Sequence, residues 1–400
     1  MDHAELTTLL TAESLRLIDE IGEIDSTTDI AAVVSRLRAA GHSPDLVSAV
    51  VGQARLRGRA QAKFGPFAQR MLFTRAGLEQ ASRLSVAARH AGRFRDAGVR
   101  RVADLGCGIG GDSLGFAGIG MDVLAVDADE ITAAIAAYNL APFAGNATVR
   151  QGRAEDTDLA GVDAVWLDPA RRTAGHSETT RTRAQDWSPS LEWAFELAER
   201  IPVGIKLGPG FDRSQLPRTD GDTAIETQWI SIDGSTIELI VWSGSLARPG
   251  VARAALVVHG DAAHELTASA DAEDVPVRAL GEFVHEPAGA VIRARLIGDV
   301  ARQLDAGMVA DGIAYLTSDS ALTSPFVQTF RIHERWPLDV KNLARALRER
   351  DIGTLEIKKR GVDIDPAALR PKLKLRGNAS ATLILTRAGA QRVALLAERV

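Results

Sequence analysis

The stretch VADLGCGIGGDSLGFA, at positions 102–117, contains one carboxylate followed by alternating glycines, whose backbone is unusually flexible. They form the pattern D-x-G-x-G-x-G through Asp104, Gly106, Gly108 and Gly110. Because glycine has no Cβ atom, such a loop allows a ligand to approach its backbone closely. Three alternating glycines also cost conformational entropy on folding, and packing alone rarely requires them. The pattern therefore predicts a ligand-binding loop between a strand and a helix.

The neighbouring carboxylates indicate which ligand this loop binds. Gly106, Gly108 and Gly111 also fit G-x-G-x-x-G, the pattern of dinucleotide-binding loops. Asp104 ends the preceding predicted strand, where its carboxylate would repel a pyrophosphate and attract an ammonium group. S-adenosylmethionine carries an α-amino group and no phosphate, so it is the predicted cofactor. Asp127 ends the next predicted strand and could accept hydrogen bonds from both ribose hydroxyls, a role that suits NAD equally.

A second motif, WLDPARRTAG at 166–175, follows another predicted strand. In an open α/β sheet, ligands bind beyond the carboxyl ends of the strands. This places Asp168 and Pro169 near the reactive methyl group as the predicted catalytic motif, with Asp168 orienting an acceptor nitrogen and also contacting the cofactor. Enzymes that methylate base nitrogens carry a second proline and an aromatic ring here, and both are absent. The alternative is that Asp168 and Pro169 only end the strand.

The segment after this motif contains the predicted substrate contacts. Trp187 either stacks on the acceptor base or belongs to the core at the start of a helix. Arg171 and Arg172 either form a basic rim or a solvated charged face. Lys206, which ends a later predicted strand, either contacts phosphate or substrate or caps the sheet edge.

The chain has one cysteine, Cys107, which lies inside the glycine loop. We interpret it as a small loop residue rather than a nucleophile. Methylation at C5 of uridine needs a cysteine that attacks the base, so this chemistry is excluded despite a superficial likeness in DPARRTAG. A nitrogen acceptor has its own lone pair and requires only proximity, alignment and a place for its proton.

Apolar runs predict the elements that position these residues. The predicted strands are 100–106, 121–127, 147–152, 163–168 and 203–208, with a helix at 128–140. Alternating buried strands and helices indicate a parallel, doubly wound α/β sheet. A hairpin at 228–242, turning at Asp233 and Gly234, would add antiparallel strands at its edge.

The 400 residues are predicted to form four regions. These are a helical region at 1–97, the strand–helix region at 98–258, a connecting region at 259–325 and a small α/β domain at 326–400. Helices are expected at 11–22, 29–41, 74–94, with Thr74 as N-cap, and near 288–304. In the last region the predicted order is strand 327–333, helix 338–350, strand 354–361, helix 365–370, strand 380–387 and helix 389–400.

The residues VADLGCGIGGDSLGFAGIGMDVLAVDAD resemble the first motif and second strand of class I S-adenosylmethionine-dependent methyltransferases. With KFGPFAQRMLFTRAGLEQ upstream, the chain is similar to the trimethylguanosine synthase group over residues 63–245. Residues 326–400 resemble the THUMP-like module found behind such enzymes in bacteria. The resemblance implies a Rossmann-like fold, S-adenosylmethionine as cofactor and an antiparallel strand after the fifth parallel strand.

The third predicted strand departs from this family. Related enzymes often end it with G-D-x, whose carboxylate meets the adenine amine, whereas this chain reads QGRAED with Arg153 at that position. Either Glu155 or Asp156, or a backbone contact from Ala154, would take that role.

The distribution of charge predicts an RNA partner although the net charge is −5. Residues 46–78 contain six bases and no acid, with Phe64, Phe67 and Phe73 interleaved. Residues 353–376 contain seven bases and three acids, a density that fits contacts with a phosphate backbone or an ordinary basic surface. The predicted phosphate contacts are Lys358, Lys359 and Arg360.

These observations predict an S-adenosylmethionine-dependent methyltransferase acting on a nitrogen of an RNA nucleotide. A methyltransferase acting on a protein or a small molecule would leave the basic clusters unexplained. A non-catalytic RNA-binding protein with a vestigial fold is the other alternative, suggested by the incomplete motif after Asp168. The N-terminus lacks a signal pattern, no run approaches ~18 apolar residues, and the histidines lack metal-ligand spacing. We therefore expect a cytoplasmic protein with neither a membrane nor a metal partner.

Overall fold

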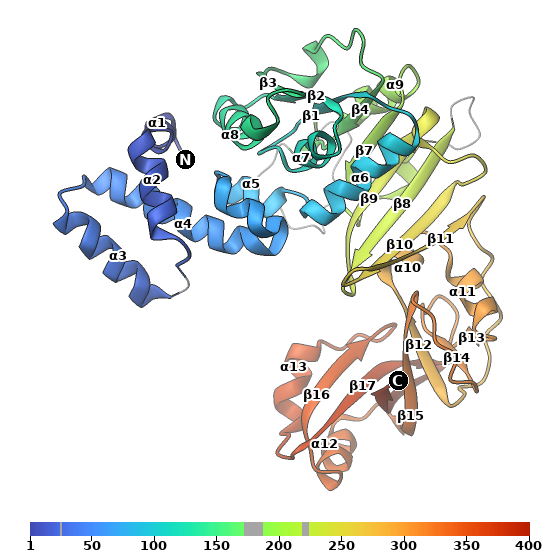
Figure 1. The fold of residues 1–400 in the computed structure, drawn as a ribbon. Helices are drawn as coiled ribbons and strands as arrows, with labels where there is room; N and C mark the ends of the chain where they lie inside the picture. Colours follow the sequence, from blue (N-terminus) through green and yellow to red (C-terminus); the bar gives the residue numbers. More distant parts are fainter. Residues whose placement is uncertain (25, 172–186, 218–223) are drawn as a thin grey trace. The chain divides into compact units, whose positions relative to one another are not determined.

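Figure 1 shows the computed structural model, which describes residues 1–24, 26–171, 187–217 and 224–400. The chain divides into two compact units. The first consists of Met1–Leu207, Gln215–Ile225 and Val241–Ala247, and the second of Gly208–Ser214, Glu226–Ile240 and Arg248–Val400.

The first unit begins with helices, as predicted. These are α1 (His3–Leu9), α2 (Ala12–Ile21), α3 (Thr27–Ala39), α4 (Pro44–Phe64), the 3₁₀ helix η1 (Gly65–Arg70), α5 (Arg75–Gln80) and α6 (Leu84–Asp96). The helices expected at 11–22 and 29–41 are confirmed as α2 and α3. Thr74 accepts a hydrogen bond from the Gly77 amide at 2.9 Å and caps α5. The single helix expected at 74–94 is wrong, because the chain leaves helical geometry after Gln80 and α6 begins separately.

A nine-stranded sheet follows, in the order β11-β10-β8-β9-β7-β4-β1-β2-β3. Its parallel strands are β1 (Arg101–Leu105), β2 (Asp122–Asp127), β3 (Ala147–Gln151), β4 (Ala164–Leu167) and β7 (Val203–Leu207). All five match the predicted strands. The helices α7 (Gly111–Gly118) and α8 (Glu130–Leu140) connect β1 to β2 and β2 to β3, and both pack against β2 (Figure 1).

The predicted hairpin is present as β8 (Ile225–Ile232) and β9 (Ser235–Ser243). Asp233 and Gly234 both have positive φ, 47° and 83°, as the tight turn requires. The hairpin does not form the edge of the sheet. Strand β10 (Arg253–His259) pairs in parallel with β8, and β11 (Ala262–Ala268) pairs antiparallel with β10 and is the last strand.

Close packing joins α6 to α7 beside the glycine loop. A Cβ atom on Gly115 of α7 would lie 2.7 Å from the Ala87 carbonyl group of α6. Only a glycine at this position therefore allows the two helices to pack so closely. Their buried faces enclose the aromatic side chains of Phe94, Phe116 and Trp166.

The C-terminal sheet has the order β13-β14-β12-β15-β18-β17-β16. Its strands are β12 (Phe283–Pro287), β13 (Gly307–Met308), β14 (Leu316–Ser318), β15 (Val327–Pro337), β16 (Ile352–Lys359), β17 (Ala379–Ala388) and β18 (Gln391–Arg399). The helices α12 (Val340–Glu349) and α13 (Pro366–Leu373) pack on one another and on β16 (Figure 1). Leucines from both helices and from β17 form the core.

Two predictions in this part of the chain are wrong. The last element is strand β18, not a helix, because it lies between β15 and β17 and its middle is buried on both faces. Such a strand has no alternating pattern, and its apolar run cannot be told from a helix by periodicity. The helix expected near 288–304 is two helices, α10 (Gly289–Arg293) and α11 (Ile297–Gln303), separated at Arg295, which has φ 60°.

Within the described ranges, no helix has both the length and the apolar character needed to cross a membrane.

Candidate active site

The glycine loop connects β1 to α7 and is held against β2. The amides of Gly106 and Cys107 donate to the Val126 carbonyl oxygen at 2.8 and 3.0 Å. Gly106 has φ 88°, and a Cβ atom there would lie 3.2 Å from the Asp168 carbonyl oxygen. The loop therefore passes directly beside the end of β4, where only a glycine fits without displacing backbone.

Asp127, the last residue of β2, accepts a hydrogen bond from the glycine loop. Its Oδ2 accepts a hydrogen bond from the Gly108 amide and its Oδ1 one from the Asp129 amide, both at 2.9 Å. Burial raises the pKa of this carboxyl above its ordinary value, and the two amide bonds oppose that rise. A carboxylate has about four acceptor positions, so both oxygens retain capacity for ligand hydroxyls.

Asp104 is buried at the carboxyl end of β1 and is only 1% exposed. Ser113 donates to its Oδ2 at 2.5 Å, while Oδ1 has no hydrogen-bond partner among the described residues. Burial, reinforced by the negative charge of Asp112, raises the pKa of Asp104 to about 8. An uncompensated buried carboxyl oxygen is costly, so this position favours a ligand that brings a donor or a positive charge.

A second buried carboxylate, Asp112, lies in the first turn of α7 and was not predicted to belong to the site. Its Oδ1 lies 2.8 Å from His90 Nδ1, and Ser82 donates to Oδ2 at 2.9 Å. Burial alone would raise the pKa of Asp112, but Lys206 and His90 outweigh it and lower that pKa to about 2. Asp112 is thus ionised, and because a carboxylate only accepts hydrogen bonds, His90 must carry its proton on Nδ1.

Lys206 connects Asp168 to a buried cluster that consists of His90, Asp112 and Ser82. Its Nζ lies 2.5 Å from Asp168 Oδ2, 3.0 Å from Ser82 Oγ and 3.8 Å from Asp112 Oδ2. The Lys206 side chain is 13% exposed and the Asp168 side chain 34%, so the cluster opens to solvent at Asp168.

Strand register explains why Asp168 and Lys206 meet. Leu167 pairs with Ile205 in the parallel ladder of β4 and β7, so the residues that follow them lie side by side. The sequence placed both residues at strand ends. However, only the adjacency of β4 and β7 identifies them as an ion pair.

The segment after β3 forms a 3₁₀ turn at Ala154–Asp156. Ala154 is buried, and Glu155 forms an ion pair with Arg153 at 3.4 Å. Asp156 is exposed and 3.8 Å from Arg153. Both carboxylates already have a cationic neighbour, so the backbone of Ala154 remains the simpler candidate for a ligand contact.

The structure describes some of the residues proposed to contact the acceptor nucleotide, which are Arg171, Arg172 and Trp187. Trp187 lies in β6 (Trp187–Ser188), which pairs with β5 (Ala170–Arg171), and its side chain is 5% exposed. This burial favours the core interpretation of Trp187 over stacking on a substrate. Arg172 lies outside the described residues.

Several residues of the basic stretch at 46–78 serve the interior. Arg57 is 2% exposed, donates to the Met71 carbonyl at 2.9 Å and pairs with Asp19 at 2.7 Å. Lys63 donates to the carbonyl oxygens of Leu78, Glu79 and Ala81, each at 2.8 Å, and so satisfies the end of α5. Phe64 and Phe73 are buried, whereas Phe67 is 46% exposed. The expectation that this whole stretch faces RNA is wrong for the buried members, whose polar groups already have internal partners.

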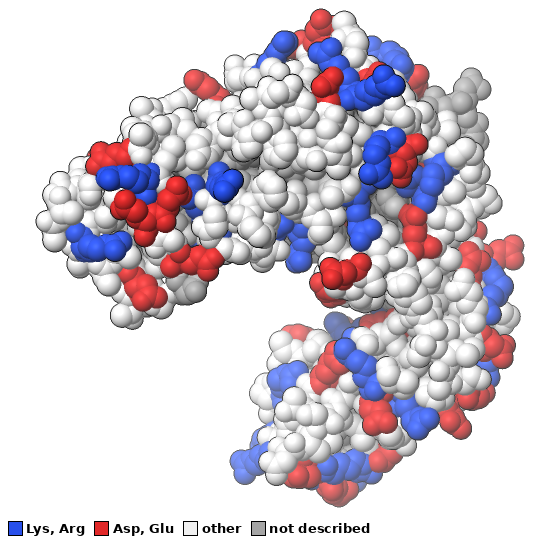
Figure 2. Space-filling model, viewed as in Figure 1, with Lys and Arg blue, Asp and Glu red and all other residues white. Residues whose placement is uncertain are grey.

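The C-terminal bases divide in the same way. Lys358 Nζ pairs with Glu286 at 2.7 Å, and Arg360 lies 3.9 Å from the same carboxylate. Lys359 is exposed. On the face seen in Figure 2, basic and acidic side chains are interspersed over the C-terminal sheet. Of the three predicted phosphate contacts, Lys359 is therefore the best exposed.

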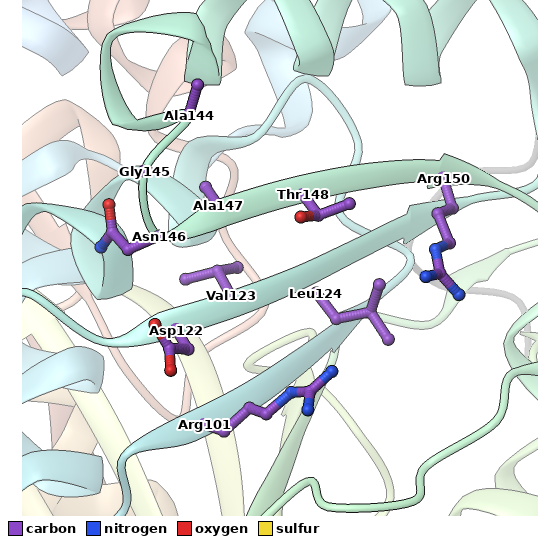
Figure 3. Close-up of a pocket in the computed structure, with 10 residues that line it drawn as sticks. All are labelled: Arg101, Asp122, Val123, Leu124, Ala144, Gly145, Asn146, Ala147, Thr148 and Arg150. Atoms are coloured by element: carbon purple, nitrogen blue, oxygen red, sulfur yellow. The ribbon is translucent and has the colours of Figure 1, made fainter.

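A surface pocket of about 220 Å³ extends from the first residues of β1 and β2 along β3 as far as Arg150. The guanidinium groups of Arg101 and Arg150 flank Leu124 there (Figure 3). Its lining does not include Asp104, Asp127 or Asp168, so this pocket is distinct from the candidate active site.

Comparison with known proteins agrees with this geometry. Two proteins of Mycobacterium tuberculosis, from strains CDC 1551 and H37Rv, are each 32% identical to the chain over 361 residues. The alignment covers 89% of this chain and 96% of each relative, and both are named uncharacterized S-adenosylmethionine-dependent methyltransferases. The chain belongs to the S-adenosylmethionine-dependent methyltransferases.

Two family models and a solved structure also match this methyltransferase. A THUMP domain-like family model matches residues 327–399, and a domain of unknown function, DUF8688, matches residues 2–60. A crystal structure from Porphyromonas gingivalis W83, described as a candidate methyltransferase, superposes with a TM-score of 0.68 at 19% identity. It covers 94% of this chain and 99% of that chain, so the two share the fold along nearly their whole length.

The residues at the end of β1 fit S-adenosylmethionine. The buried Oδ1 of Asp104 has no donor among the residues that the structure describes, and the cofactor's ammonium group would supply one. The space beside Gly108 is open where a Cβ atom would point. The Cys107 thiol is buried, and burial raises its pKa well above the ordinary value, so it stays protonated within the loop.

Proposed function

We propose that the methyltransferase modifies a nitrogen of an RNA nucleotide, with Asp168 orienting the acceptor. The observation that carries the proposal is the position of Asp168 beside Gly106 of the glycine loop, with its side chain 34% exposed. A carboxylate there can accept a hydrogen bond from the N–H of an incoming amine and leave the nitrogen lone pair facing the cofactor. Pro169 then ends β4 and fixes the direction in which the chain leaves.

The proposed cofactor contacts follow the loop. Asp104 would bind the α-ammonium group, Gly106, Gly108 and Gly110 would allow close approach, and Asp127 would bind the ribose. Ala154 or Glu155 would meet the adenine. When bound, S-adenosylmethionine supplies an electrophilic methyl group, and these residues hold it at the end of the sheet facing Asp168.

RNA as the substrate class is supported by the C-terminal region. The THUMP-like match covers the strands and helices that carry exposed bases on β16, on α13 and after it. These are Lys359, Arg370, Lys372, Lys374 and Arg376. Exposed bases on a small domain bind phosphates without reading sequence, which suits positioning of a folded RNA. Arg171 and Arg172, three and four residues after Asp168 in the sequence, remain the proposed contacts with the nucleotide nearest the acceptor.

The decisive experiment is methyl transfer to RNA isolated from a strain that lacks this enzyme. Radiolabelled S-adenosylmethionine should label that RNA and not the RNA of the parent strain. Mass spectrometry of the digested nucleosides should identify an N-methylated base. Label in protein or in small molecules alone, or on oxygen or carbon of a nucleoside, would contradict the proposal.

Asp127→Ala should weaken binding of S-adenosylhomocysteine by about 1–3 kcal/mol, since two ribose hydrogen bonds are lost. The variant also releases the Gly108 amide, which adds to the effect. Isothermal titration calorimetry measures the change. The matched control is Asp122→Ala, at the exposed start of the same strand, which should bind normally. Equal affinities for the two variants would remove Asp127 from the site.

RNA affinity should fall steeply with salt, because every phosphate neutralised by the protein releases bound counterions. Replacing Lys359, Lys372 and Lys374 with alanine should weaken binding similarly for unrelated RNAs and reduce the salt slope by about 2. Filter binding at several salt concentrations measures both. Replacing three exposed arginines of the N-terminal helices serves as the control, namely Arg16, Arg36 and Arg38. An affinity independent of salt would argue for a protein or small-molecule substrate.

A further inference from the structure

We propose that Lys206 is a positioning residue that fixes the Asp168 carboxylate for the acceptor and is itself anchored by the buried Asp112–His90 pair. This inference rests on the role proposed for Asp168. It adds His90 on α6 and Asp112 on α7, which the sequence analysis did not single out, and it gives a specific role to Lys206 in β7.

The anchor is rigid because each member is enclosed. His90 is 1% exposed, and its ring lies against Trp166 with the ring centroids 4.4 Å apart. Trp166 itself is buried in β4, where Gly204 makes room for the indole: a Cβ atom on Gly204 would lie 2.8 Å from it. Strand β4, which is directly followed by Asp168, thus also packs through Trp166 against His90, the residue that orients Asp112.

Asp112 links the enclosed His90 to Lys206. One of its oxygens faces His90 Nδ1, and the other faces Ser82 and the Lys206 ammonium group. A buried carboxylate is tolerated only when it is paired and hydrogen-bonded. Asp112 therefore holds Lys206 at one point, and Ser82 holds it at a second.

Lys206 then restricts Asp168. Its Nζ also lies 2.5 Å from Asp168 Oδ2, closer than to Ser82 Oγ or Asp112 Oδ2. Asp168 is the most exposed member of the group, and a carboxylate at a strand end could otherwise take several rotamers. Holding one oxygen fixes the plane of the carboxylate, and misplacement by about 1 Å can cost roughly 100-fold in rate.

The charges around Lys206 favour the same role. Asp104 on β1, Asp112 on α7 and Asp168 after β4 all interact electrostatically with one another or with Lys206. Lys63 on α4 also interacts electrostatically with Lys206, and burial together with Lys206 lowers the pKa of Lys63. The Lys206 ammonium group is attracted to the ionised Asp112 and to Asp168, and it lies closer to Asp168.

The test compares Lys206→Met, Lys206→Arg and Asp168→Asn in the full-length enzyme, with Lys341→Met, an exposed lysine of α12, as control. Lys206→Met should lower kcat for RNA about 100-fold while S-adenosylhomocysteine affinity changes little, and it should lower Tm because Asp112 loses its buried cation. Lys206→Arg, which keeps the charge, should recover part of the loss. Added methylammonium should partly restore a Lys206→Ala enzyme, an effect that a purely structural lysine would not give.

The double variant separates action through Asp168 from an independent effect. If Lys206 works through Asp168, adding Lys206→Met to Asp168→Asn should lower kcat little further, because residues that act as a unit are non-additive. Additive losses would overturn the positioning role. Crystal structures with S-adenosylhomocysteine supply a readout that needs no RNA. Asp168 should occupy one conformation in the wild type and several in Lys206→Met.

The outcomes distinguish this inference from the proposed function. If Asp168→Asn lowers kcat and Lys206→Met does not, the positioning role is wrong and the function stands. If Asp168→Asn leaves kcat unchanged, the role of Asp168 is wrong. If no RNA is labelled by the wild-type enzyme, the proposed function fails, and an unchanged Asp168 conformation in Lys206→Met crystals would then overturn the inference as well.

Discussion

Asp168→Asn should lower turnover by about 100- to 1,000-fold, because a positioned group that accepts from the reacting amine contributes on this scale. The asparagine keeps the size of the side chain but removes the charge that faces Lys206 and the acceptor. Affinity for S-adenosylhomocysteine should stay nearly constant, since the proposed contact is with the acceptor nitrogen. Single-turnover methyl transfer and calorimetry measure the two quantities separately.

A control at the other end of the sheet excludes a general effect of removing a carboxylate. Asp122→Asn, at the exposed start of β2, should retain wild-type turnover. If Asp168→Asn behaves like this control, the residue only ends β4. The reacting end of the site must then be sought among other residues.

Asp104→Asn should remove the pH dependence of cofactor binding. Burial raises the pKa of Asp104 to about 8, so in the free enzyme the carboxyl is mostly protonated below that pH. Binding an ammonium group favours the ionised form, so the wild type must release a proton on binding. Affinity for S-adenosylhomocysteine should therefore rise as the pH rises from about 6 to 8 and then level off, by linkage. The asparagine variant should bind about 10- to 100-fold more weakly at pH 8, as expected when a charged hydrogen bond is lost, and with little slope.

The stability of the free enzyme should show the opposite trend. A carboxyl whose pKa is higher in the folded than in the unfolded protein binds more protons in the folded state between the two values. Between the ordinary value of 3.8 and about 8, Asp104 therefore makes the folded state less stable as the pH rises. Thermal unfolding at pH 5 and 8.5 should show a smaller fall in Tm for Asp104→Asn than for the wild type. An identical fall in both proteins would mean that Asp104 is ionised throughout.

The sequence by itself determined the elements around the cofactor loop. The parallel strands β1, β2, β4 and β7 are short apolar runs bounded by turn residues, and these are local signals. The glycine pattern, Asp104 and Asp127 could be placed at strand ends for the same reason. The Asp233–Gly234 turn was equally predictable, since its positive φ angles suit those residues.

Burial on both faces removed such signals elsewhere. Strand β18 has an unbroken apolar run because it is a central strand of the C-terminal sheet, so its sequence matches a helix as well as a strand.

The charges of Arg57 and Lys63 were likewise misleading. Their position in the sequence suggests a basic surface, but their guanidinium and ammonium groups satisfy carbonyl oxygens inside the first unit.

Only the tertiary structure assembled the group that connects His90, Asp112, Lys206 and Asp168. These residues come from two helices and two strands, and their distances follow from two non-local facts. The register of β4 against β7 places Asp168 beside Lys206, and the close approach of α6 and α7 at Gly115 brings His90 to Asp112. Periodicity records which face of an element is buried but not which element covers it. For that reason the sequence marked the cofactor loop and placed Asp168 and Lys206 at strand ends, but it did not show the contacts of Lys206 with Asp168, Ser82 and Asp112.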